Sequence, residues 1–130
     1  MAGPAAVDLV HLLAELLDNA AAFSPPTAPI VVTGAAERDG YLVEIADRGL
    51  GMTDQELAWA NQRLTGRGPS ADPDTQAAGD RLGLVLVGRL AGRNGFEVRL
   101  GGSPAGGVSA VVRLPAAVLG PSPAVPVRRR

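Results

Sequence analysis

The sequence predicts an α/β fold in one domain, and three patterns in the chain lead to this prediction. Apolar side chains recur every three or four residues over 5–22, as they do along the buried face of an amphipathic helix. Two strand-like runs, at 30–33 and 41–46, flank an Asp-Gly pair, which is typical of a β-hairpin. A further helix and two strands are expected at 80–93, 96–100 and 108–114.

The composition of the chain narrows the classes of function. The chain has 130 residues, a formal net charge of -1, no Cys and one His, and all of its 12 basic residues are Arg. A net charge near zero argues against a nucleic-acid-binding protein, which needs clustered positive charge. The absence of Cys excludes disulfides and thiolate zinc sites, and one His cannot build a multi-histidine metal centre. No apolar run reaches the roughly 18–20 residues of a membrane span, so we expect no membrane contact by this chain and a cytoplasmic location.

Proline, glycine and capping residues mark where the predicted elements begin and end. The segment SPPTAP at 24–29 ends the first helix, because proline disfavours helical geometry in the residue before it. Thr53 and Glu56 have the spacing of a capping box, which predicts a short helix running to about residue 64. Residues 65–79 contain almost no large apolar side chain, so we interpret them as a mobile loop whose length indicates a function.

Three short sequence patterns could form a functional site, and the first two contain acidic or amide side chains that could bind a ligand. Glu15 and Asn19 are four residues apart, so both project from one face of the first helix. Asp47 ends a strand and is followed by Gly49 and Gly51, whose conformational freedom permits a close approach of the backbone to a flat ligand. Each pattern also has an ordinary structural explanation, a solvated helix face for the first and a strand-ending turn capped by Asp for the second.

The third pattern is GDRLGL at 79–84, which follows the loop and opens a helix. Helix N-termini offer unpaired N–H groups to anions, and glycines let a phosphate come close. The alternative is that the two glycines mark the end of a loop and a close contact between helices. Each of the three patterns is a weak signal alone, but in this order and spacing they form a strong one.

These segments resemble the motifs of one superfamily. HLLAELLDNAAAFSPP (11–26) resembles the N box of the GHKL ATPases, which include gyrase-type topoisomerases, heat-shock chaperone ATPases, mismatch-repair proteins and histidine kinases. IADRGLGM (45–52) resembles the first glycine box, and GDRLGLVLVGRLAGRNG (79–95) the second. GGVSAVVRLP (106–115) is similar to the strand that closes the domain in bacterial sensor kinases. The chain is most similar to actinobacterial sensor histidine kinases of the nitrate/nitrite-sensor type.

The resemblance implies a two-layer α/β sandwich, the Bergerat fold, with a mixed, mainly antiparallel sheet and helices on one face. Residues 1–115 would form the ATP-binding domain, with a lid at about 65–78, and residues 116–130 a disordered tail rich in Pro and Arg. Relatives carry one or more strands before the N-box helix, and we expect this sequence to lack them.

The resemblance also implies a role for each matching residue. Asn19 would coordinate Mg²⁺, and Asp47 would accept a hydrogen bond from the adenine amino group of ATP. Glu15 would be the catalytic residue that helps to activate the accepting His, and Gly49 and Gly51 would shape the floor of the adenine pocket. Gly79 and Gly83 would border the lid and the phosphates, and the remaining cofactor-binding residues would be Arg81, Leu82 and Leu84.

The chain departs from the family pattern at Arg81, which stands where the second glycine box often has a glycine. Its side chain would either contact phosphate or crowd it. Arg89 and Arg93 either contact phosphate or a partner, or belong to a solvated helix face. His11 is either solvated or hydrogen-bonded near Glu15.

The function implied is the transfer of the γ-phosphoryl group of Mg·ATP to a His on a separate dimerisation domain, with a response regulator as the next partner in two-component signalling. No phosphoacceptor motif precedes the domain in this sequence, so we expect the chain to be weakly active or inactive without that partner. Two alternatives are a degenerate nucleotide-binding or interaction module without kinase activity, and an anti-sigma-type serine kinase.

Overall fold

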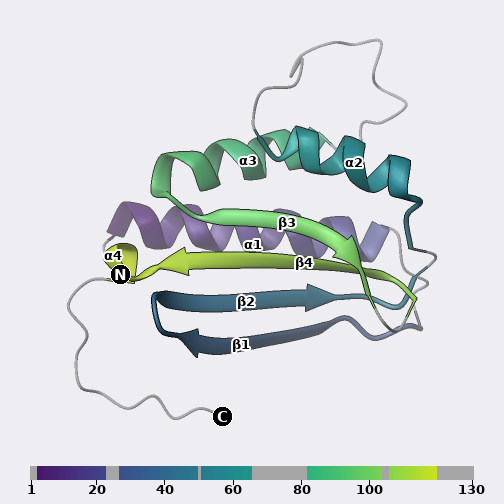
Figure 1. Cartoon of the computed structure of the whole chain (residues 1–130), viewed down its shortest axis with the longest axis horizontal. Helices are drawn as coiled ribbons and strands as arrows, with labels where there is room; N and C mark the ends of the chain where they lie inside the picture. The colour runs from purple at the N-terminus through teal and green to yellow at the C-terminus, as the bar shows by residue number, and fades with distance from the viewer. Residues whose placement is uncertain (1–2, 23–26, 50, 66–81, 104–105, 120–130) are drawn as a thin grey trace.

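The computed structural model describes residues 3–22, 27–49, 51–65, 82–103 and 106–119. The strands in this part of the chain form one sheet in the order β1-β2-β4-β3, and each neighbouring pair is antiparallel. Helices α1 and α3 run along one face of the sheet, and α2 lies beside β3 (Figure 1). The predicted two-layer α/β sandwich is confirmed. The elements are α1 (Gly3–Ala22), β1 (Val31–Glu37), β2 (Gly40–Ala46), α2 (Asp54–Arg63), α3 (Leu82–Asn94), β3 (Glu97–Gly102), β4 (Val108–Pro115) and α4 (Ala116–Leu119).

The first strand of the hairpin is longer than the sequence pattern predicts. It continues through Gly34, Ala35 and Ala36, which are residue types with little strand propensity. Antiparallel pairing with β2 holds these residues in the strand, with Gly34 opposite Val43. The ring of Tyr41 also covers Gly34, where a Cβ atom would lie 2.6 Å from the Tyr41 hydroxyl oxygen. Cross-strand pairing therefore overrides the local preference of this segment.

The C-terminal boundary also differs from the prediction. Residues 116–119 form α4 instead of the beginning of a tail, because Val118 and Leu119 pack against the core. The rest of the predicted tail lies outside the described residues. So does the predicted lid at about 65–78, apart from Thr65.

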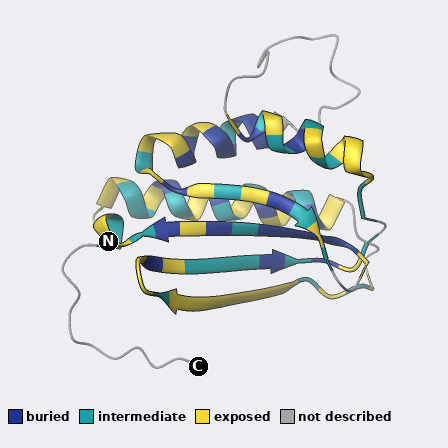
Figure 2. Cartoon of the chain, in the orientation of Figure 1, coloured by how far each residue is buried: buried dark blue, intermediate teal, exposed yellow. Residues whose placement is uncertain are grey.

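The core lies between the helices and one face of the sheet (Figure 2). Helix α1 presents apolar residues one turn apart, and strand β4 buries alternate residues against the helices, as expected for a half-buried strand. The largest fully buried side chains come from α1, α3, β2 and β4, and they are Leu12, Leu16, Ile45, Leu84, Val87 and Val112.

A buried carboxylate joins the beginning of α1 to the end of α3. Asp8 is 9% exposed, and it accepts hydrogen bonds from Nε and Nη2 of Arg93, both at 2.9 Å, and from Nδ2 of Asn94 at 2.8 Å. The hydrogen bonds from Arg93 and then Asn94 lower the pKa of Asp8 to about 2. Arg93, a candidate for a phosphate or partner contact, is instead an ion-pair partner within the fold.

We predict that Asp8→Asn lowers the Tm by a few degrees at pH 7, because a neutral side chain loses the charge-assisted hydrogen bonds. Folding lowers the pKa of Asp8 from 3.8 to about 2, so this stabilisation is present above pH 3.8 and is lost as the pH falls toward 2. The Tm values of the two proteins should therefore converge on acidification.

Thermal unfolding between pH 7 and the most acidic pH at which both proteins are folded measures this convergence. Asp18→Asn is the matched control, because Asp18 is an exposed acid on the same helix. A difference in Tm between wild type and Asp8→Asn that stays constant as the pH falls would contradict the prediction.

Candidate functional site

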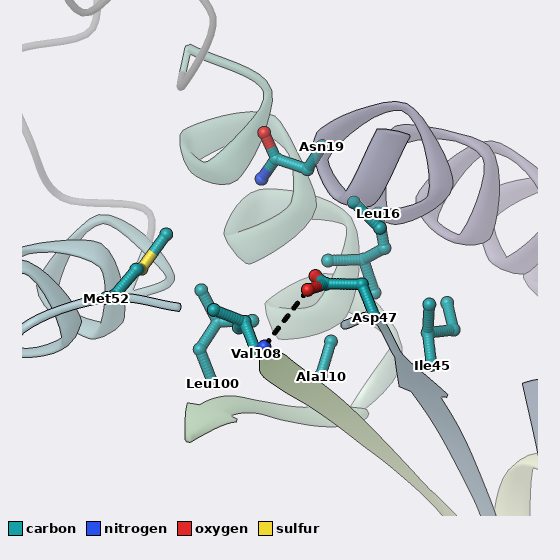
Figure 3. A pocket seen from close by; sticks show the side chains of 9 residues that line it. Leu16, Asn19, Ile45, Asp47, Met52, Leu100, Val108 and Ala110 are labelled. Carbon is teal, nitrogen blue, oxygen red and sulfur yellow. Dashed lines mark hydrogen bonds between the residues drawn. The ribbon is translucent and has the colours of Figure 1, made fainter. Parts of the chain in front are cut away.

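A pocket opens between the C-terminal half of α1 and the sheet (Figure 3). It contains about 350 Å³ of empty space, part of it open to solvent. Asn19 and Asp47 are its polar lining residues, and the others are apolar. The pocket therefore brings together Asn19 of α1 and Asp47 at the end of β2, the predicted metal-binding and adenine-binding residues. The lining residues are Leu16, Asn19, Ala20, Ile45, Asp47, Met52, Leu100, Val108 and Ala110.

The Asp47 carboxylate is held by the backbone while it faces the pocket. Asp47 is 3% exposed, and its Oδ1 accepts hydrogen bonds from the N–H groups of Gly49 at 2.8 Å and Val108 at 3.2 Å. Its own N–H donates to the Val108 carbonyl at 3.0 Å. Within the part of the chain that the structure describes, Oδ2 accepts no hydrogen bond. Asp47 is therefore both a strand-end cap, through Oδ1, and an available acceptor in the pocket, through Oδ2.

Glycines make room for this carboxylate. Gly51 has a φ of +78°, and a Cβ atom there would lie 2.8 Å from the Gly106 carbonyl oxygen. A Cβ atom on Gly107 would overlap both the carboxylate and the carbonyl oxygen of Asp47. Gly49 and Gly51 are not among the lining residues; they belong to the loop that carries Asp47, and their predicted place at the floor of an adenine pocket stays a prediction.

Glu15 lies beside the pocket and not in its lining. Its side chain reaches the first turn of α3, where a Cβ atom on Gly83 would overlap Oε1 of Glu15. Glycine at this position therefore lets α3 approach the carboxylate closely. Asn19, one turn further along α1, is half-buried and lines the pocket, whereas His11, one turn before Glu15, is exposed.

The other predicted site residues are placed only in part. Leu84 is fully buried in the core and is not among the residues that line the pocket, so its predicted part in cofactor binding stays a prediction. Leu82 begins α3, while Gly79 and Arg81 lie outside the described residues. No group of three His, Cys, Asp or Glu side chains suited to a metal ion occurs in the described residues.

Sequence reasoning missed several residues that build the site. Gly107 packs against Asp47, and the Gly106-Gly107 pair directly before the last strand was a signal that the backbone approaches another group closely. Met52 and Leu100 form part of the apolar wall. No local pattern identifies Leu100, because it reaches the pocket through the pairing of β3 with β4.

Comparisons with known proteins agree with this geometry. Residues 5–118 match the family of histidine kinase-, DNA gyrase B- and HSP90-like ATPases. The sensor protein QseC of Escherichia coli K12 is 36% identical over 101 residues, which are 78% of this chain and 20% of QseC. The sensor-like histidine kinase SenX3 of Mycobacterium tuberculosis is 32% identical over 112 residues, or 85% of this chain and 26% of SenX3. The chain thus spans about a fifth to a quarter of the length of these relatives.

Solved structures show the same likeness. The mycobacterial sensor histidine kinase MprB matches with a TM-score of 0.65 and 25% identity, covering 84% of this chain and 70% of that chain. The ATP-binding domain of PrrB from Mycobacterium tuberculosis matches with a TM-score of 0.62 and 26% identity, covering 89% of this chain and 69% of that chain. Since the family match spans nearly the whole described chain and the fold agrees, the chain belongs to the histidine kinase-, DNA gyrase B- and HSP90-like ATPases.

Proposed function

We propose that the pocket binds the adenine of ATP. The observation that carries this proposal is the Asp47 carboxylate, 3% exposed, with one oxygen held by the backbone and the other available in an apolar pocket. Adenine has flat apolar faces and an exocyclic amino group that donates a hydrogen bond, so it complements such a pocket. Guanine has a carbonyl oxygen in the place of this amino group, and two facing acceptors repel. Asp47 should therefore favour ATP over GTP.

Asn19 is the proposed protein ligand of Mg²⁺. Magnesium prefers hard oxygen ligands, and it often takes only one or two from the protein, with phosphates and water completing the shell. The side chain of Asn19 lines the same pocket as Asp47, which fits a metal ion held mainly by the nucleotide. When bound, Mg²⁺ would neutralise part of the phosphate charge.

We propose that the bound nucleotide donates its γ-phosphoryl group to a His on a separate dimerisation domain, which then passes it to a response regulator. A nitrogen of the accepting imidazole would form the new bond to phosphorus as the bond to the ADP oxygen breaks. Glu15 lies one helical turn from Asn19 and against the start of α3, where its carboxylate can accept a hydrogen bond from the imidazole. Its carboxylate would thereby orient the acceptor.

The names of the relatives, a sensor protein and a sensor-like histidine kinase, support a module of a sensor kinase, and we propose that this module is cytoplasmic. Within the described residues, no helix has both the length and the apolar character to cross a membrane. Incubation of the chain with ATP and either a His-bearing dimerisation domain or a Ser-bearing protein tests the acceptor. Transfer to His supports the proposal, transfer to Ser favours an anti-sigma-type kinase, and nucleotide binding without transfer favours a module without kinase activity.

We predict that Asp47→Asn weakens ATP binding by about 10- to 100-fold, the range expected for a lost hydrogen bond to a charged group. The Asn oxygen would keep the backbone hydrogen bonds of Oδ1, so its amino group would face the amino group of adenine. The same amino group would suit the carbonyl of guanine, and the preference for ATP over GTP should shrink.

Calorimetry with Mg·ATP and Mg·GTP measures both effects. Asp39→Asn is the control, since Asp39 lies in the β1–β2 turn, at the opposite end of β2 from Asp47. Equal ATP affinity in wild type and Asp47→Asn would refute the adenine site.

We predict that Gly83→Ala slows phosphoryl transfer by about tenfold while the affinity for ATP changes less than threefold. The added methyl group would overlap Oε1 of Glu15 and force the carboxylate away from its position. Rates of transfer from labelled ATP and calorimetric affinities separate the two effects.

Gly92→Ala is a matched control on the same helix, because a Cβ atom there meets nothing within 4 Å. That substitution should raise stability by about 0.5–1 kcal/mol and leave transfer unchanged. A rate for Gly83→Ala equal to that of Gly92→Ala would refute the role of the close contact with Glu15.

A further inference from the structure

One side chain outside the pocket binds the backbone of a residue that lines it. Asn61 lies on α2, and both atoms of its amide are used: Nδ2 donates to the Leu100 carbonyl at 2.9 Å, and Oδ1 accepts from the Leu100 N–H at 2.8 Å. The two residues are 39 positions apart in the chain. The contact is therefore a tertiary link between α2 and β3.

The position of Leu100 explains why this link matters. Strand β3 is at the edge of the sheet, with β4 on one side, where Leu100 is opposite Ala110. Asn61 binds the backbone groups of Leu100 on the other side, where a further strand would otherwise pair. Leu100 is 7% exposed, so loss of these hydrogen bonds would leave buried backbone groups unpaired. The Asn61 side chain thus replaces one residue of a missing neighbouring strand.

Both structures that Asn61 joins contribute to the pocket wall. Leu100 lines the pocket from β3, and Met52 lines it from the segment directly before α2. A capping box ties that segment to the helix, because Thr53 N–H donates to Glu56 Oε1 at 2.8 Å and Glu56 N–H donates to Thr53 Oγ1 at 3.1 Å. Figure 3 shows Met52 on the opposite side of the pocket from Asp47, with Leu100 between them in this view.

Apolar packing alone does not fix this arrangement. Ala60 and Leu64 of the α2 region are buried in the core, but apolar burial has no direction, and it permits small shifts of a helix along a sheet. Two hydrogen bonds to one residue of β3 define where α2 lies along that strand. They therefore define how far Met52 lies from Leu100 and Asp47.

We propose that Asn61 is a positioning residue of the nucleotide site, which sets the width of the pocket for a planar base by holding α2 at Leu100. The proposal rests on the adenine-binding function proposed above. Asn61 touches no ligand in this role and acts through Leu100 and Met52.

The test replaces Asn61 in two ways. Asn61→Asp has nearly the same shape but turns an acceptor toward the Leu100 carbonyl, and Asn61→Leu retains the side-chain volume and loses both hydrogen bonds. We expect each to weaken ADP binding about tenfold, as expected when a pair of hydrogen bonds that positions the site is lost. Gln62→Glu is the matched control, because it makes the same amide-to-carboxylate change at the exposed neighbouring position, and it should bind within twofold of wild type.

A second readout separates positioning from stability. The chain has two methionines, Met1 and Met52, so a spectrum of ¹³C-methyl methionine reports on the pocket wall with one signal of interest. In the ligand-free protein, at a temperature where circular dichroism shows all variants folded, the Met52 signal should shift or split in Asn61→Asp and Asn61→Leu and not in Gln62→Glu. If Asn61→Asp does not fold, Asn61→Leu provides the comparison.

The outcomes are distinguishable. An unchanged Met52 signal together with ADP affinities within twofold of wild type in both Asn61 variants would overturn the proposal, even if their Tm values fall. If wild type itself does not bind ADP, the adenine site fails, and the ligand-free Met52 signals still decide whether Asn61 places the wall.

Discussion

The Asp47 carboxylate links the sheet to the pocket, because one of its oxygens binds the backbone of the sheet and the other is available to a ligand. Its Oδ1 accepts hydrogen bonds from the N–H groups of Gly49 and Val108: the first closes the loop after β2, and the second joins the end of β2 to the beginning of β4. Gly107 can lie this close to Asp47 only because it has no side chain. An acceptor that was merely exposed in a loop would be solvated and would discriminate poorly between ligands. Here the backbone holds one oxygen, so the other has a defined direction among apolar neighbours, where a mismatched partner is costly.

The sequence was sufficient to predict the elements whose signals are local. The capping box at Thr53 and Glu56 forms as predicted, because both groups lie within one helical turn. The spacing of Glu15 and Asn19 on α1 likewise follows from helix geometry alone. Asn19 and Asp47 do line one pocket, although they lie on different elements. Their meeting followed from the family resemblance, since no pattern in either segment specifies the distance between them.

The parts that escaped prediction depend on contacts between distant residues. Asn61 is an ordinary polar residue on a short helix, and only its pairing with Leu100 gives it a role. Gly34 belongs to a strand because β2 pairs with it and Tyr41 covers it, against its own preference. Leu84 stands in a glycine-rich motif and is a predicted cofactor-binding residue, while its side chain is fully buried in the core. Motif membership identifies a segment near the site, while burial decides which of its side chains face the ligand.

The placement of α1 links the fold to the chemistry. Asn19 belongs to the helical layer and Asp47 to the sheet, so the distance between them depends on how α1 is held against its neighbours. At one end Asp8 binds Arg93 and Asn94 of α3, and further along Glu15 lies against Gly83 at the start of α3. Helix α3 therefore binds α1 through Asp8 and contacts it again at Glu15, while α2 is hydrogen-bonded to β3 separately through Asn61. A ligand that spans Asn19, Asp47 and Met52 contacts α1, the end of β2 and the segment before α2. Its binding free energy thus depends on contacts that lie well outside the pocket.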